Sequence, residues 1–172
     1  MPESLSKFGL VSKVGPPYQG HLAEGRRAEI SRAVAVRMAG VIMLERLLDS
    51  VILIDHFNDI EAASAFIAGL DPGRTAISVI TYAEILVGFE DQAVEDVKGL
   101  LSHYEILGID APVAEKAAEL RRRYGWKLPD AFQAGLALHH RLRLCTRNTK
   151  DFNPKMHSFV EVPYRLRSRQ SA

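Results

Sequence analysis

From Met43 onward, short apolar runs alternate with amphipathic segments, and this alternation limits the possible folds more than any other feature of the sequence. Strands separated by helices form βαβ units, in which a parallel sheet is covered by helices on both faces. We therefore predict a three-layer α/β/α domain with a mostly parallel central sheet of about five strands. The expected strands are 44–48, 75–78, 104–107, 142–146 and 159–162, and the expected helices are 60–68, 80–88, 90–101, 112–124 and 129–140. Residues 51–54 fit either a buried strand or a first helical turn, because a short apolar run does not distinguish the two.

The sequence divides into three parts. Residues 1–42 form an N-terminal extension, residues 43–165 the compact domain, and residues 166–172 a basic tail. Within the extension, Gly15-Pro16-Pro17 interrupts any early element, whereas residues 28–41 have the spacing of one amphipathic helix. Two interpretations of the extension stay open: an appendage to the domain, or a start codon assigned too far upstream.

The composition excludes several classes of protein. The single cysteine, Cys145, excludes an internal disulfide framework and a Cys-rich zinc site, and we expect it to be buried in a strand. No apolar run approaches the roughly 20 residues of a membrane span. Lys and Arg residues also interrupt any signal-peptide core near the N-terminus. We therefore expect a cytoplasmic protein without a membrane partner.

The net charge of +1 conceals an uneven distribution. Residues 43–140 contain eight Lys or Arg and sixteen Asp or Glu, a net charge of −8, whereas residues 141–172 contain eight and two, a net charge of +6. An acidic middle suits a metal centre, and the basic C-terminal stretch suits a polyanion bound beside it. The alternative is a solvated basic tail that only keeps the protein soluble.

Three carboxylates lie next to apolar runs, at junctions between strands and helices: Asp49, Glu84 and Asp130. Because the carboxyl ends of parallel strands meet at one edge of the sheet, we expect these acids to converge there. Carboxylates that converge repel one another unless a hard cation such as Mg²⁺ or Mn²⁺ joins them. Alone, Glu84 is also compatible with a solvated helix residue and Asp130 with a charge that only stabilises its helix. Together they predict a metal-dependent enzyme of phosphate chemistry.

The helix around Glu84 has a predicted orientation. Helical spacing places Glu84 on one face with Thr81 and Gly88, and it places Ile80, Ala83 and Val87 on a neighbouring apolar face.

Four segments, LLDSVILIDHF, ISVITYAEILVG, LPDAFQAGLAL and LCTRNTKDF, resemble in order the motifs of PIN-domain ribonucleases, and especially the VapC-type toxins of toxin–antitoxin pairs. The resemblance covers residues 43–165. It implies that Asp49, Glu84 and Asp130 are catalytic and metal-binding, with Asp55 as a secondary candidate.

This chain departs from the PIN pattern at two positions. Val51 stands where the family often has a small polar residue, which removes one supporting hydrogen bond. Asn148 stands where many members have an aspartate, and a carboxylate follows at Asp151. The fourth metal ligand is therefore either Asn148 or Asp151, and Asp151 is also a catalytic candidate. The alternatives for Asp151 are that it binds a second ion, acts through water or only caps the loop. Thr146 is a candidate for the water shell of the metal.

The resemblance also implies a mechanism and partners. We expect one or two Mg²⁺ or Mn²⁺ ions to activate water for hydrolysis of transfer or ribosomal RNA, with Arg147 and Lys150 contacting phosphates. No role is expected for His139 and His140. The expected protein partners are a second copy of the chain, in a homodimer, and a VapB-like antitoxin. The groove of this chain that receives the antitoxin would involve Phe57, Ile60 and Phe66, although these residues fit the ordinary core better.

Two other functions are compatible with parts of this pattern. One is a PIN-like domain without catalysis that binds RNA or acts as a scaffold; the joint presence of Asp49, Glu84 and Asp130 argues against it. The other is a phosphoacceptor signalling domain, which also uses acids at the sheet edge with Mg²⁺. That class has adjacent acids after its first strand and a late lysine, whereas Asp49 has no acidic neighbour and the late motif contains Arg147.

Overall fold

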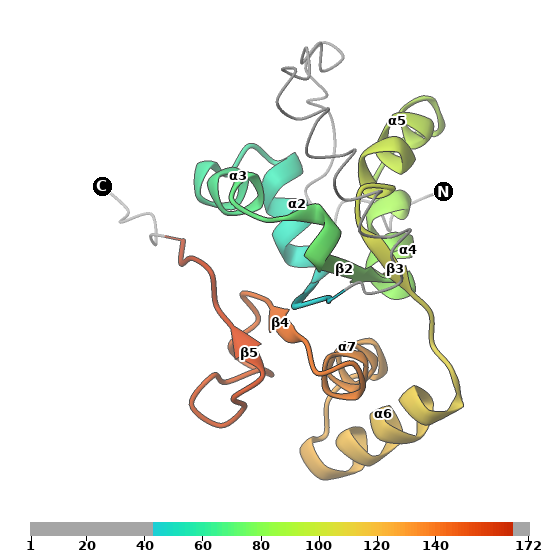
Figure 1. The fold of residues 1–172 in the computed structure, drawn as a ribbon, viewed down its shortest axis with the longest axis vertical. Coiled ribbons are helices and arrows are strands. Elements are labelled where there is room, and N and C mark those ends of the chain that lie inside the picture. Colours follow the sequence, from blue (N-terminus) through green and yellow to red (C-terminus); the bar gives the residue numbers. More distant parts are fainter. Residues whose placement is uncertain (1–42, 167–172) are drawn as a thin grey trace, which may run out of the picture.

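The computed structural model describes residues 43–166, so the predicted extension, its helix over 28–41 and most of the basic tail lie outside the described residues. The elements alternate as predicted (Figure 1). The strands are β1 (Arg46–Leu48), β2 (Thr75–Ser78), β3 (Glu105–Leu107), β4 (Arg143–Cys145) and β5 (Val160–Glu161). The helices are α2 (Ser50–Phe57), α3 (Glu61–Ala68), α4 (Val79–Val87), α5 (Asp91–Leu101), α6 (Ala111–Tyr124) and α7 (Leu128–His139), with a 3₁₀ turn, η2, at Pro72–Arg74. Each predicted strand and helix is present, with ends shifted by a few residues.

The five strands form one parallel sheet in the order β3-β2-β1-β4-β5, which confirms the predicted α/β class. β1 lies in the centre, where Leu48 is in register with Ile77 of β2 and Cys145 of β4. The chain adds β2 and β3 on one side of β1 and then β4 and β5 on the other. The strand order therefore reverses at the boundary between β1 and β4, where open parallel sheets usually carry their sites.

Successive side chains of each strand enter two different cores, because neighbouring residues of a strand point to opposite faces. Leu47, Ala76 and Leu144 belong to the core that α6 and α7 cover. Their neighbours Leu48, Ile77 and Cys145 belong to the core on the other face, together with residues of α2, α4 and α5. Figure 1 shows α6 and α7 on one side of the sheet and α2 to α5 on the other, which gives the predicted three layers.

The open question of residues 51–54 is resolved in favour of a helix. Asp49 has an extended backbone (φ −75°, ψ 149°) and is the N-cap of α2, so the chain turns directly from β1 into a helix. Similar turns begin α4 and α6, where a side chain caps the helix: Ser78 Oγ accepts a hydrogen bond from the Thr81 amide at 2.9 Å, and Asp110 Oδ1 accepts one from Val113 at 3.0 Å. These short turns place the first residues of α2 and α4 at one edge of the sheet.

The apolar face that helical spacing predicts for α4 is not the buried face of this helix. Thr81 and Ile85 are its buried residues, whereas Ala83 is exposed and Val87 is 70% exposed. The prediction used apolar residues alone, and it missed Thr81, whose hydroxyl donates a hydrogen bond to the Leu48 carbonyl at 3.2 Å. A buried hydroxyl with a partner can thus face the core in place of an apolar side chain.

Within the described residues, each helix is too short or too polar to pass through a lipid bilayer. Cys145 is fully buried, as predicted.

Candidate active site

A polar pocket opens at the carboxyl ends of β1 and β4, where the strand order reverses. It has a volume of about 190 Å³ and is lined by Asp49, Ser50, Val51, Ile80, Glu84, Pro129, Asp130, Gln133 and Asn148. Three of the predicted acids, contributed by the end of β1, by α4 and by α7, therefore line one pocket.

Asp49 is held in place by the strand next to it. Its backbone N–H donates to the Cys145 carbonyl at 3.0 Å, and its Oδ2 accepts a hydrogen bond from Thr146 Oγ1 at 2.5 Å. Burial, together with the charges of Glu84 and Asp130, raises the pKa of Asp49 to about 6, although the hydrogen bond from Thr146 opposes this shift. The carboxylate thus occupies a position where its negative charge is unfavourable unless a cation is near.

Asp130 lies in the first turn of α7, as predicted. Burial raises its pKa, and the charges of Asp151 and Glu84 act in the same direction, while Lys127 and Asn148 oppose them. Glu84 is exposed on α4 but lines the same pocket. Its charge raises the pKa of both aspartates, which shows that the three carboxylates influence one another.

Asn148 links the remaining candidates. Its Nδ2 donates to Asp151 Oδ2 at 2.9 Å and approaches Asp130 Oδ1 at 3.5 Å, while its Oδ1 accepts from the Asp151 backbone N–H at 3.3 Å. Its own backbone N–H donates to Thr146 Oγ1 at 3.0 Å. Asp151 does not line the pocket itself and is joined to it through Asn148. The Thr146 hydroxyl therefore connects the Asp49 side of the site to the Asn148 side.

Gln133 and Thr81 belong to the site and were not predicted as site residues. Gln133 lines the pocket, is 3% exposed, and donates through Nε2 to Thr81 Oγ1 at 2.6 Å. Among the described residues its Oε1 has no hydrogen-bond partner. The sequence contains a usable signal, because Gln133 follows Asp130 by three positions and so shares its helix face.

Two residues that were predicted as candidates, Asp55 and Arg147, lie outside the pocket. Asp55 lies on α2, is 6% exposed and forms a bidentate ion pair with Arg147. Arg147 Nε donates to Asp55 Oδ2, and Arg147 Nη2 donates to Asp55 Oδ1 at 2.7 Å. Tyr164 donates a third hydrogen bond to Asp55 Oδ2 at 2.8 Å. Asp55 is therefore not part of the pocket, and the guanidinium of Arg147 is directed toward α2. Lys150 is exposed on the loop beside Asp151, and His139 and His140 are exposed at the far end of α7.

Comparison with known proteins identifies the family of the chain. The family model described as the PIN domain matches residues 46–153, more than half of the chain, and this range contains each of the predicted site residues. The chain belongs to the PIN-domain family. This membership, together with the structures that follow, confirms the resemblance to VapC-type toxins.

Solved structures of similar fold include a toxin–antitoxin complex. One is a toxin–antitoxin complex from Klebsiella pneumoniae, with a TM-score of 0.66, 37% sequence identity, and coverage of 71% of this chain and 100% of that chain. Another is DNA-bound VapBC from Salmonella typhimurium, with a TM-score of 0.59, 25% identity, and coverage of 69% and 98%. FitAcB from Neisseria gonorrhoeae, at 24% identity, a TM-score of 0.60 and coverage of 70% and 99%, shows likeness of fold alone. No curated protein matches the chain.

PIN domains are generally nucleases, and PIN nucleases generally use divalent metals. The donor chemistry of this PIN domain fits such an ion, because carboxylate and amide oxygens are the ligands that hard cations prefer. The unpartnered Gln133 Oε1 and the unfavourable charge of Asp49 both favour a cation in the pocket. Within residues 43–166, however, no three His, Cys, Asp or Glu side chains are grouped closely enough to hold an ion as they stand. The ligand set of Asp49, Glu84, Asp130, Asn148 and Asp151 therefore stays a prediction.

Proposed function

We propose that this PIN domain is a metal-dependent endoribonuclease that hydrolyses RNA phosphodiester bonds and acts as the toxin of a type II toxin–antitoxin pair. The observation that carries the proposal is the convergence of Asp49, Glu84 and Asp130 in one pocket, where burial and mutual repulsion raise the pKa of Asp49 to about 6. A pocket of carboxylates repels a phosphodiester, so cleavage there requires a cation between the two.

Asp49, Glu84 and Asp130 would hold Mg²⁺ or Mn²⁺, with Asn148 or Asp151 as a further ligand. When bound, the ion would neutralise charge on the phosphoryl oxygens and lower the pKa of a water molecule. Thr146 orients the Asp49 carboxylate through its 2.5 Å hydrogen bond, and Asn148 orients Asp151 through its 2.9 Å hydrogen bond. Both residues belong to the segment that follows β4, so this segment sets the geometry of the acids.

The experiment that tests the activity uses isosteric variants, which remove charge without removing volume. Wild-type protein, Asp49→Asn, Glu84→Gln and Asp130→Asn are each incubated with total RNA in Mg²⁺, in Mn²⁺ and in EDTA. Asp91→Asn is the matched control, because Asp91 is an exposed acid on α5 outside the pocket. We expect discrete cleavage that needs metal, is lost in the three pocket variants and persists in the control. RNA binding without cleavage in the wild type would instead support the alternative of an inactive RNA-binding or scaffolding module.

The same experiment extends to the fourth ligand and to the RNA. Asn148→Ala and Asp151→Asn separate the two candidate ligands by the Mg²⁺ concentration that each variant needs for half-maximal cleavage. The proposed substrates are transfer or ribosomal RNA, and the proposed phosphate contacts are Lys150 and Arg147. A contact from Arg147 would have to use the N–H groups that Asp55 leaves free, since a guanidinium has five donors.

The partners proposed are a VapB-like antitoxin and a second copy of the chain, and the place of action is the cytoplasm. The support for an antitoxin is that one similar solved structure, at 37% sequence identity, is itself a toxin–antitoxin complex. Phe57, Ile60 and Phe66 are each half-buried, and Phe57 contacts the Phe89 ring edge-on at 5.0 Å. Their role in an antitoxin groove can be tested by co-purification of a tagged antitoxin with alanine variants of the three residues.

A further inference from the structure

An aromatic cluster joins two segments that are distant in the sequence. Tyr124, the last residue of α6, and Trp126, in the turn between α6 and α7, stack with ring centroids 4.6 Å apart. Phe152 and His157, in the loop between β4 and β5, meet them edge-on: Trp126 to Phe152 at 5.0 Å and Tyr124 to His157 at 5.0 Å. Phe152 is fully buried and Trp126 is 5% exposed, so the turn and the loop are packed firmly together.

The turn itself is held in one conformation. Gly125 has a positive φ of 70° and ends α6, which suits a residue without a Cβ. Arg121 Nη1 then donates to the Trp126 carbonyl at 2.9 Å, and the Arg123 guanidinium lies 5.3 Å from the centre of the Tyr124 ring. The residues that follow Trp126, including Lys127, therefore have a defined position relative to the β4–β5 loop.

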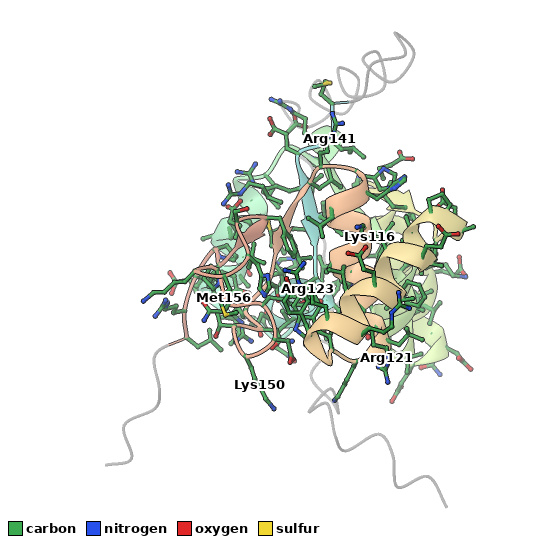
Figure 2. All side chains as sticks on the ribbon, turned by 90° about the horizontal axis from the view of Figure 1, so that it is seen from below. Lys116, Arg121, Arg123, Arg141, Lys150 and Met156 are labelled. Carbon is green, nitrogen blue, oxygen red and sulfur yellow. The ribbon has the colours of Figure 1, made fainter. Side chains whose placement is uncertain are left out.

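Exposed cations lie in the last turn of α6, in the turn that follows it and in the loop between β4 and β5. We call them the basic edge: Arg122, Arg123, Lys127, Lys150 and Lys155. Figure 2 shows Arg123 at the carboxyl end of α6, near the loop that carries Lys150 and Met156. Among the described residues, none of these five is within ion-pair distance of a carboxylate. By contrast, Lys98 and Lys116, whose side chains are each 42% exposed, pair with Glu95 at 2.7 Å and with Glu119 at 2.6 Å.

The basic edge adjoins the acidic pocket. Lys127 precedes Asp130 by three residues and is the N-cap of α7, and its charge opposes the rise in the pKa of Asp130. Lys150 is next to Asp151, which is hydrogen-bonded to Asn148 in the pocket wall. Cations without ion-pair partners beside a group of acids attract a polyanion that the acids alone would repel.

We propose that the basic edge binds the phosphate backbone of a single-stranded RNA and directs one of its phosphodiester bonds into the pocket. This inference rests on the proposed nuclease function and adds the path of the substrate. The path runs over the turn between α6 and α7 and the loop between β4 and β5. Arg123 and Lys127 contact phosphates from the first segment, and Lys150 and Lys155 contact them from the second.

The test measures how RNA affinity depends on salt, because each phosphate contact releases counterions when it forms. A fluorescein-labelled single-stranded RNA of mixed sequence is titrated with protein in EDTA, where metal-dependent cleavage is suppressed, and its anisotropy is followed at several NaCl concentrations. The variants are Arg123→Gln/Lys127→Gln and, from the other segment, Lys150→Gln/Lys155→Gln. The matched control is Lys98→Gln/Lys116→Gln, which removes the same charge at the two ion-paired lysines.

For single strands, each phosphate contact that is lost reduces the slope of log K against log salt by about 0.7, so each basic-edge variant is expected to lose about 1.4 from its slope. The control is expected to keep the wild-type slope. Circular dichroism spectra that match the wild type show that the variants are folded. Wild-type slopes in both basic-edge variants, or an equal loss in the control, would overturn the inference.

The cleavage assay separates this inference from the proposed function. A wild-type protein that cuts RNA with metal, combined with unchanged slopes in the variants, would refute the basic edge alone. A wild-type protein that neither binds nor cuts RNA would refute both.

Discussion

Removal of Arg147 should destabilise the protein far more than removal of an ordinary surface arginine. Asp55, on α2, accepts hydrogen bonds from two nitrogens of Arg147 and from the hydroxyl of Tyr164. Arg147 follows β4 and Tyr164 follows β5, so one carboxylate joins three segments of the chain. The side chain of Asp55 is 9% exposed and that of Arg147 is 23% exposed, so the ion pair is largely buried.

The expected magnitude follows from this burial. In Arg147→Ala the Asp55 carboxylate keeps only the hydrogen bond from Tyr164, and loss of one partner of a buried ion pair costs about 3 to 5 kcal/mol. Because the Arg147 side chain is 23% exposed, water can enter the space it leaves, and we expect the lower limit, about 3 kcal/mol. At about 2 to 4 °C per kcal/mol for a chain of this size, the midpoint of thermal unfolding should fall by about 6 to 12 °C.

The assay is urea unfolding followed by far-UV circular dichroism, with Arg143→Ala as the matched control. Arg143 also pairs with a carboxylate, Glu161 at 3.3 Å, but its side chain is 56% exposed, so its removal should cost less than about 1 kcal/mol. The double variant Asp55→Leu/Arg147→Leu should recover much of the loss, since no charge is left buried without a partner. If Arg147→Ala costs no more than Arg143→Ala, the argument from burial is wrong.

Three further predictions concern other parts of the molecule. Asp49→Asn should stabilise the protein in EDTA at neutral pH: the rise in the pKa of Asp49 from 3.8 to about 6 corresponds to an upper limit of about 3 kcal/mol. Because the pKa of Asp49 is higher in the folded protein, the loss of stability that its charge causes is absent below about pH 4 and grows as the pH rises to about 6. Mg²⁺ should stabilise the wild type and not the variant. A variant only as stable as the wild type at neutral pH in EDTA would contradict the prediction. Burial raises the pKa of the Cys145 thiol to about 12, so a thiol reagent at mildly alkaline pH should modify it only after unfolding, and rapid labelling of the native protein would contradict its burial. Gly135→Val should cost about 1 to 3 kcal/mol in urea unfolding, because an added Cβ would lie 3.2 Å from the Val113 carbonyl of α6. Gly99→Ala should not destabilise the protein, because beyond its own helix backbone and chain neighbours the added Cβ meets none of the described residues within 4 Å.

The strands of this fold could be predicted because a parallel sheet covered on both faces requires apolar residues at consecutive positions. Leu47 and Leu48, or Leu144 and Cys145, satisfy this requirement within a few residues, and helical spacing identifies most of the rest. The face of α4 was not predicted, because a rule based on apolar residues treats Thr81 as polar. The structure buries Thr81 through hydrogen bonds to Leu48 and Gln133, which are distant in sequence.

Some residues of the candidate site, like most elements of the fold, can be recognised from the sequence. Asp49 is recognisable because it ends an apolar strand at a helix start, and helix starts after parallel strands lie at one edge of the sheet. Asp130 is recognisable by the Leu-Pro pair that starts α7, although that helix follows α6 and not a strand. The partner of Asp55 was not recognisable. A buried acid requires a cation, but the sequence contains 22 Lys and Arg residues. Which of them reaches Asp55 depends on the tertiary structure.

The adjacency of β1 and β4 explains both the acidic pocket and the ion pair behind it. Strand pairing places Leu48 opposite Cys145, so the next residues along each strand, Asp49 and Thr146, meet at the edge of the sheet and share a hydrogen bond of 2.5 Å. One residue after Thr146, beyond the end of β4, Arg147 points to the other side and reaches Asp55 on the helix that begins after Asp49. The segment after β4 is therefore held on one side by the site and on the other by α2. A change at Arg147 should then alter the positions of Thr146 and Asn148, and reduce cleavage, even in conditions where the variant remains folded.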